Sequence, residues 1–303
     1  MPSTEALPAS QDIEDYVSRL KAGLPDLHID TLDVLGDGWD HVAIEANGII
    51  FRLPKDHLPK PKREARVKYE TAALKLLQPK LDVAIPDPKY VSKDYEFFGY
   101  PKLPGIIAYD AQSEMSQEQR DQYLRDWVRL AVAIHNAIPP EQGATLNVPN
   151  DDLARHLVHA EKIDQIETSS AQLLRFAQKT IAQARTVDFS KRSQVFLHND
   201  FHSKNILLEP KTYRICGIID WTDIKLGPPE CELSVLEWGD GNDIEHAARL
   251  YGEQTGITID IPMAKTIRHL IEIRDYVQQV QRGDKQGAME SKDQILKWAE
   301  QGR

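Results

Sequence analysis

The sequence predicts an α+β protein in which a β-rich first part precedes a larger, mostly helical part. The dipeptide Asn47-Gly48 separates two short β-like runs, Val42–Ala46 and Ile49–Leu53. Asn-Gly between such runs is a strong hairpin signal. Farther along, apolar side chains recur at helical spacing over Tyr123–Ile134, which indicates one face of a buried helix. A chain of 303 residues is long for one compact core and natural for two packed lobes.

The remaining elements follow from the same kinds of pattern. A helix is expected near Lys62–Gln78, and a short strand region is expected over Lys89–Tyr100. Two prolines and a glycine within Pro101–Gly105 mark a hinge, which gives a small N-lobe in residues 1–102 and a C-lobe in residues 103–303. The C-lobe is expected to hold a β-like island at 195–198, 205–209 and 214–219, and helices near 151–166, 171–184, 242–255, 262–281 and 289–301.

Composition and charge limit the classes of function. Lys and Arg number 37 against 47 Asp and Glu, so the formal net charge is 37 − 47 = −10. That balance disfavours nucleic acid and suits a cationic partner. No apolar run approaches the roughly 20 residues needed to cross a bilayer, residues 1–11 lack the pattern of a secretion signal, and Cys216 and Cys231 do not suggest a disulfide framework. We therefore expect a cytoplasmic protein that binds neither nucleic acid nor membranes.

The β-like island carries the strongest chemical signal. His198, Asp200 and Asn205 form the pattern H-x-D-x-x-x-x-N, and the next strand ends in Asp220. This is the base and magnesium arrangement of kinases. Asp200 is expected to accept or orient the substrate hydroxyl proton, and Asn205 and Asp220 to offer Mg²⁺ the hard oxygen ligands that it prefers. His198 is expected to pin the loop. Asp and Asn also form ordinary turns, but the full set beside strand-like runs is more specific.

Two further motifs suit a nucleotide phosphate chain. Gly36 and Gly38 lie between β-like stretches, where glycine lets backbone amides approach phosphate oxygens; an ordinary hairpin turn is the alternative. Arg52 stands inside an apolar strand and needs an anionic partner. We expect it to contact the α- and β-phosphates and to be held by Glu70 on the following helix. Glu64 competes for that acidic role, and a surface ion pair is the other interpretation.

The hinge is the expected contact for the purine of ATP or GTP. Residues Tyr100 and Leu103 bound it, and its backbone groups would bind the base. Pro101 has no N–H, so Leu103 is the expected donor.

These motifs resemble the aminoglycoside phosphotransferase family of small-molecule kinases. The stretch 198–207 is similar to the family's H-G-D-x-H-x-x-N-I-L, with Asn199 in place of Gly, and 219–221 is similar to its I-D-W. The turn 36–40 and the strand 51–54 resemble those of the antibiotic kinases that act on aminoglycosides (2″ type) and macrolides. The segments 130–139 and 221–229 continue the resemblance, and Glu232 stands where the family has an acidic residue.

The resemblance runs from about residue 32 to 255 and implies a bilobal protein-kinase-like fold. It implies transfer of the γ-phosphate of Mg-ATP or Mg-GTP to an alcohol. By resemblance, the substrate site follows Asp220, where Glu237, Asp240 and Asp243 would bind ammonium groups and Trp238 would form a packing wall. Acidic residues near a helix start also serve as caps.

The expected substrate is an aminoglycoside antibiotic, and the expected biological role is antibiotic resistance. The alternatives of the same fold are a macrolide 2′-phosphotransferase and a kinase of choline, homoserine or a sugar. The alternative of another class is a non-catalytic, kinase-like nucleotide-binding module.

Overall fold

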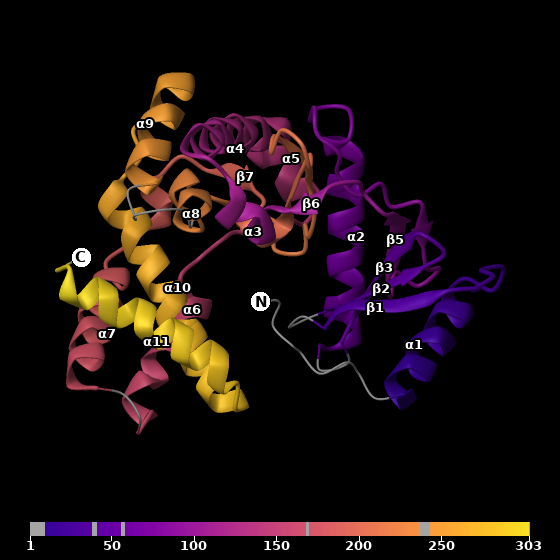
Figure 1. The fold of residues 1–303 in the computed structure, drawn as a ribbon, viewed down its shortest axis with the longest axis horizontal. Coiled ribbons are helices and arrows are strands. Elements are labelled where there is room, and N and C mark those ends of the chain that lie inside the picture. Colours follow the sequence, from indigo (N-terminus) through magenta and orange to yellow (C-terminus); the bar gives the residue numbers. More distant parts are fainter. Residues whose placement is uncertain (1–9, 38–40, 56–57, 168–169, 237–242, 303) are drawn as a thin grey trace. The chain divides into compact units, whose positions relative to one another are not determined.

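The computed structural model describes residues 10–37, 41–55, 58–167, 170–236 and 243–302. The chain forms two compact units, the first made of residues 1–123, 137–148 and 203–224, and the second of residues 124–136, 149–202 and 225–303. The predicted α+β class is confirmed, because antiparallel sheet dominates the start of the chain and helices dominate its end (Figure 1). The lobe boundary at residues 102 and 103 stays a prediction.

The first unit is built on a five-stranded antiparallel sheet with strand order β1-β2-β3-β5-β4. Asn47 and Gly48 turn β2 into β3 with φ of 52° and 77°. Because Asn and Gly tolerate this left-handed region, the turn forms where the sequence predicts it. A register shift between Val34 and Gly36 marks a bulge in β1. The first three strands are β1 (Leu32–Asp37), β2 (His41–Ala46) and β3 (Ile49–Pro54).

The stretch expected to be one strand region is a pair of short strands, which corrects the prediction for Lys89–Tyr100. The strands β4 (Tyr90–Val91) and β5 (Phe98–Pro101) run antiparallel to each other. The Ser92 hydroxyl accepts hydrogen bonds from the amides of Glu96 (2.8 Å) and Phe97 (3.1 Å), and these bonds close the turn between the strands.

The core of this sheet is formed by alternate residues of its strands. In β2 the buried residues are Val42, Ile44 and Ala46, and the residues between them are half-buried. Leu20 of helix α1 (Ser10–Gly23) packs into the same core. Helix α2 (Lys60–Leu77) confirms the helix predicted near this position and lies beside the sheet in Figure 1.

A second, three-stranded sheet of the first unit positions the metal-binding candidates. Its order is β6-β8-β9, from β6 (Ile106–Ile107), β8 (Ile206–Leu208) and β9 (Ile215–Ile218). The turn η4 (Ser203–Asn205) enters β8, and the Ile219 amide after β9 donates to the Asn205 carbonyl at 2.9 Å. The short helices of this unit are α3 (Ala108–Ala111), η1 (Gln112–Glu114) and α5 (Pro140–Thr145).

The second unit is mostly helical and is organised around α10 (Ile261–Arg282). This helix packs against α6, α7, α8, α9 and α11, and it supplies several residues of a large apolar core. Gly283, with φ of 77°, ends α10, and the Asp284 side chain caps α11. The other elements are α6 (Ala154–Ala160), η2 (Glu161–Gln165), α7 (Ala171–Ala184), η3 (Phe189–Lys191), β7 (Val195–Leu197) paired with β10 (Lys225–Gly227), α8 (Pro229–Ser234), α9 (Asp243–Thr255) and α11 (Lys285–Glu300).

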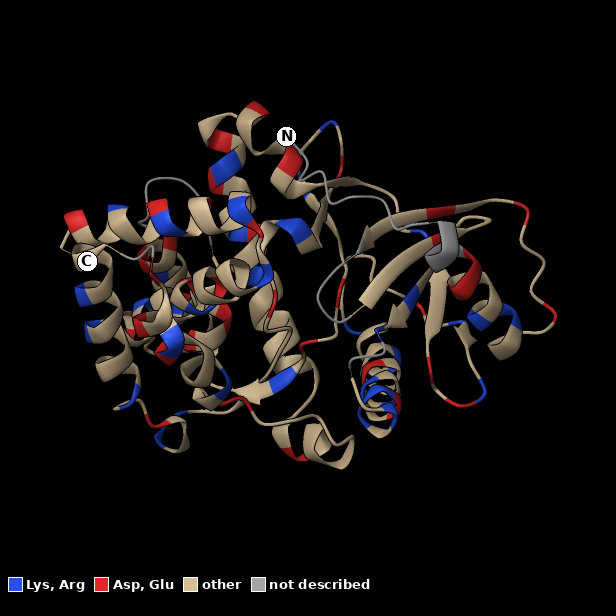
Figure 2. Ribbon diagram, turned by 90° about the horizontal axis from the view of Figure 1, so that it is seen from below, with Lys and Arg blue, Asp and Glu red and all other residues tan. Residues whose placement is uncertain are grey.

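Helix α4 (Gln117–Ala137) is divided between the two units. Its first turn is closed by a capping box between Ser116 and Gln119, which explains where the helix begins. Acidic and basic residues are interspersed along the helices (Figure 2). Within the described part of the chain, every helix is too short or too polar to cross a bilayer.

Candidate functional site

Arg52 is the buried centre of a charged cluster in the first unit. It lies inside β3 with an exposed fraction of 6%. Its guanidinium lies 3.3 Å from Glu70 Oε1 and 2.6 Å from Asp220 Oδ1, and it donates to the Thr222 hydroxyl. The ion pair predicted between Arg52 and Glu70 is therefore present, whereas Glu64 pairs with a lysine of its own helix.

Two carboxylates share this one guanidinium, and their pKa values move in opposite directions. Burial raises the pKa of Glu70 to about 7, although Arg52 opposes that rise. Burial would also raise the pKa of Asp220, but Arg52, His41 and a hydrogen bond from Thr222 hold it well below its usual range. Asp220 is thus the carboxylate that stays fully ionised, in keeping with its shorter contact to Arg52.

The three-stranded sheet joins the segments that carry Asp220 and Asn205. Asp220 follows β9 with φ of 60°, a left-handed conformation that is uncommon outside glycine. Asn205 is buried at the end of η4 and is joined to the segment before Asp220 through its carbonyl. An ionised carboxylate and a carboxamide are oxygen donors of the kind that Mg²⁺ takes, so the residues fit that ion. The described residues hold no group of three or more His, Cys, Asp or Glu suited to a metal.

The loop that carries Asp200 belongs to the second unit. The Asp200 amide donates to His198 Nδ1 at 3.3 Å, so the buried His198 ring braces the loop as the sequence predicts. His202 Nε2 lies 3.3 Å from Asp200 Oδ1, whose side chain is about one-third exposed. Asn205 and Asp220 belong to the first unit. The predicted meeting of Asp200 with those two residues therefore stays a prediction.

The base loop is also held by a carboxylate to which sequence reasoning assigned no role. Glu232, on α8, is fully buried. Its two oxygens accept hydrogen bonds from the amides of His198 (2.7 Å) and Asn199 (2.9 Å). Asn199 has φ of 65°, which explains how Asn can replace glycine at this position. Helix α8 also carries Glu230, so its pattern does not single out Glu232; the available signal was the resemblance, in which Glu232 stands where the family has an acidic residue.

The remaining residues predicted to contact the nucleotide are Tyr100, Leu103 and Gly36. Tyr100 is buried in β5, and burial raises its pKa to about 12. Leu103 follows the strand, and the amide of its neighbour Lys102 donates to the Gly48 carbonyl at 2.9 Å. A Cβ added at Gly36 would meet no atom within 4 Å, so there is open space beside the backbone there. Their roles toward a nucleotide stay predictions.

The substrate candidates fall mostly outside the described part of the chain. The described residues do not include the substrate candidates Glu237, Trp238 and Asp240, nor Gly38 of the glycine turn. Asp243 is described and is the first residue of α9. A carboxylate there is stabilised by the positive end of the helix dipole, which is the alternative to a role in substrate binding.

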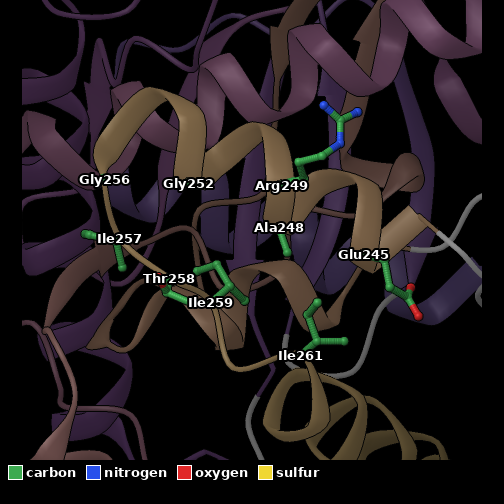
Figure 3. Close-up of a pocket in the computed structure, with 9 residues that line it drawn as sticks. All are labelled: Glu245, Ala248, Arg249, Gly252, Gly256, Ile257, Thr258, Ile259 and Ile261. Atoms are coloured by element: carbon green, nitrogen blue, oxygen red, sulfur yellow. The ribbon is translucent and has the colours of Figure 1, made fainter.

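A shallow pocket lies between α9 and the loop that leads to α10. Its volume is about 340 Å³, and isoleucines 257, 259 and 261 line it (Figure 3). The two charged residues at its rim have partners, because Glu245 accepts from Lys265 and Arg249 donates to Glu253. The pocket therefore suits an apolar group better than the ammonium groups of a cation.

The sequence of this chain matches the model of the phosphotransferase enzyme family over residues 31–260. The chain belongs to that family. All the candidate residues of this phosphotransferase, from Gly36 to Asp243, lie inside the matched range. No curated protein matches the chain.

Solved structures of similar fold include three informative examples. The GDP complex of aminoglycoside 2′-phosphotransferase-IIIa is 18% identical, with 96% of this chain and 99% of that chain covered and a TM-score of 0.75. The streptomycin–ATP complex of APH(2″)-IIa is 17% identical, with 96% and 97% covered and a TM-score of 0.63. A macrolide 2′-phosphotransferase from Brachybacterium faecium is 20% identical, with 92% and 97% covered and a TM-score of 0.62. The predicted kinase-like fold of this phosphotransferase is therefore confirmed.

Proposed function

We propose that this phosphotransferase moves the γ-phosphate of ATP or GTP, bound with Mg²⁺, to a hydroxyl of a small cationic compound, an aminoglycoside. The observation that carries the proposal is the charged cluster in which the buried Arg52 contacts the buried Glu70 and the partly exposed Asp220, in the same unit as Asn205. Burying charged groups costs free energy of folding, and groups of this kind are concentrated at functional sites.

Each residue of the cluster has a defined task in this proposal. Arg52 presents a planar fork of donors that suits phosphate oxygens, and Glu70 keeps that fork oriented. Asp220 and Asn205 hold Mg²⁺, which when bound supplies neutralisation of phosphate charge. Asp200 accepts or orients the proton of the acceptor hydroxyl, so that the oxygen is ready to attack in line.

The preference for a cation rests on charge and on likeness. The chain has a formal net charge of −10, and Asp243 follows the residues where the acceptor site is predicted. Similar structures contain kanamycin, gentamicin or streptomycin, each at under 20% identity. A macrolide 2′-phosphotransferase has a similar fold as well, and a macrolide would need a wide apolar site instead of carboxylates.

The test is a panel of acceptors assayed with ATP and with GTP in the presence of Mg²⁺. Kanamycin, gentamicin, streptomycin, a macrolide, choline and homoserine should be compared by nucleotide diphosphate release and by mass of the phosphorylated product. We expect phosphorylation of at least one aminoglycoside and its loss when EDTA removes the metal.

Each other outcome of the panel identifies a different alternative. Turnover with the macrolide alone would identify a macrolide kinase, and turnover with choline or homoserine alone would identify a metabolite kinase. Tight nucleotide binding without any transfer would overturn the proposal in favour of a non-catalytic binding module.

A further inference from the structure

Glu232, which holds the loop that carries Asp200, is itself in contact with a further buried side chain. His135 of α4 is buried, and its Nε2 lies 3.5 Å from Glu232 Oε2. The other ring nitrogen, Nδ1, lies 2.8 Å from the hydroxyl of Tyr251 on α9. Tyr251 is 1% exposed. A chain of polar contacts within the second unit thus joins α9 to the amides that precede Asp200.

The chemistry of imidazole sets the direction of these contacts. A neutral imidazole carries one N–H, and its other nitrogen accepts. If the Tyr251 hydroxyl donates to Nδ1, the proton of His135 is on Nε2, which lies 3.5 Å from a Glu232 oxygen, an electrostatic contact without hydrogen-bond geometry. The opposite arrangement would turn a lone pair of Nε2 toward the carboxylate, which is repulsive. Burial raises the pKa of the Tyr251 hydroxyl, which keeps its proton available for donation.

The Tyr251 hydroxyl therefore selects the tautomer of His135 that stabilises Glu232. Glu232 is fully buried, and a carboxylate out of water needs every donor it can obtain. It accepts hydrogen bonds from the amides of His198 and Asn199, and Asn199 has a left-handed backbone conformation. If Glu232 were less well stabilised as a carboxylate, its hydrogen bonds to the two residues directly before Asp200 would weaken, and the loop would become more mobile.

We propose that Tyr251 and His135 are positioning residues for Asp200, acting through Glu232 to hold the base loop in its reactive conformation. This inference rests on the proposed function, because it assigns to Asp200 the role of the base. It also gives α9 a role in positioning the loop that carries Asp200. Tyr251 and His135 do not act on the substrate themselves, and their effect is expected on the chemical step.

The test is Tyr251→Phe, which removes one hydroxyl and keeps the ring. The matched control is Tyr276→Phe on α10, a tyrosine that is also 1% exposed in the same unit. Hydrogen–deuterium exchange of the amides in 198–202 should become about tenfold faster in Tyr251→Phe alone, while α7 keeps its protection. With an acceptor found in the panel, kcat should fall about tenfold while the nucleotide KM stays within about twofold.

A second variant separates positioning from simple loss of packing. His135→Gln keeps a donor near the place of Nε2, whereas His135→Ala removes it. We expect the Gln variant to retain more of the kcat and more of the loop protection than the Ala variant.

Three results would overturn the inference: unchanged exchange in 198–202, equal effects of Tyr276→Phe, or equal loss in the Gln and Ala variants. Because the exchange measurement needs no acceptor, it is decisive even if the wild-type protein phosphorylates nothing. In that event the proposed function fails, and the exchange result still reports on the anchor.

Discussion

The two groups of catalytic candidates are held in different ways. Arg52 is held by side chains, since it binds Glu70 and Asp220, which are 18 and 168 positions away along the chain. The loop of Asp200 is held through its main chain, because the amides of His198 and Asn199 donate to one buried carboxylate. The first arrangement is a set of ion pairs between side chains, and the second is a backbone anchor.

This difference separates two tasks of a phosphotransferase. A guanidinium that binds carboxylate oxygens can bind phosphate oxygens with the same geometry, so the Arg52 cluster is suited to exchange a partner when a nucleotide arrives. A base must be placed before the reaction, because reorganising it would add to the barrier. Substitutions in the cluster should therefore change nucleotide binding, and substitutions in the loop should change turnover.

The largest effect is expected at Asp200. In Asp200→Asn the side chain keeps its size but loses its capacity to accept a proton, so kcat should fall by about 10² to 10⁴. The nucleotide dissociation constant, measured by calorimetry, should change by less than about threefold, because the loop anchor and the Arg52 cluster are both intact. Full turnover in this variant would remove Asp200 from the role of base, and a parallel loss of nucleotide affinity would erase the distinction between the two regions.

A smaller effect is expected at Arg52. In Arg52→Lys a single ammonium cannot reach Glu70 and Asp220 as the guanidinium does with its two terminal nitrogens. The nucleotide KM should rise about tenfold, with a smaller change in kcat. Arg249→Lys is the control, since Arg249 pairs with Glu253 on the exposed face of α9, where such a pair contributes little. An unchanged KM in Arg52→Lys would show that this arginine is structural.

Much of the first region was predictable from the sequence. Arg52 inside an apolar strand demanded an anion, and a helix with an acidic residue follows it in the chain. The Asn47-Gly48 hairpin and the position of Asp220 at a strand end were predictable because turn and strand signals are local. Helix α1 was not predicted, and the bounds of strand β1 were not predicted because the strand is bulged at Leu35.

The support of the second region was not predictable in the same way. His135, Glu232 and Tyr251 come from three helices, and the hydrogen bond between His135 and Tyr251 spans 116 positions. On its own helix each of these residues occupies a core position, and a pattern of apolar spacing does not indicate which polar residues meet. Thr222 was missed for a related reason, because a hydroxyl two residues after Asp220 has the appearance of an ordinary turn residue until Arg52 is seen to bind it.

An effect on stability, with no direct change in turnover, is expected at Glu70 as a change in the pH dependence of unfolding. Its folded pKa of about 7 lies above the ordinary value of 4.5. Between these two values the unfolded chain releases the proton and the folded chain keeps it, so the free energy of unfolding falls as pH rises through this window. The sign is the reverse of that for a carboxylate with a lowered pKa.

In Glu70→Gln this fall should disappear, and the difference in free energy of unfolding between variant and wild type should grow by up to about 3 kcal/mol from pH 4.5 to pH 7. Urea unfolding across that range measures it, with Glu253→Gln as an exposed control. A constant difference would mean that Arg52 keeps Glu70 ionised throughout, and the cluster would then be a fixed ion-pair network instead of an exchangeable one.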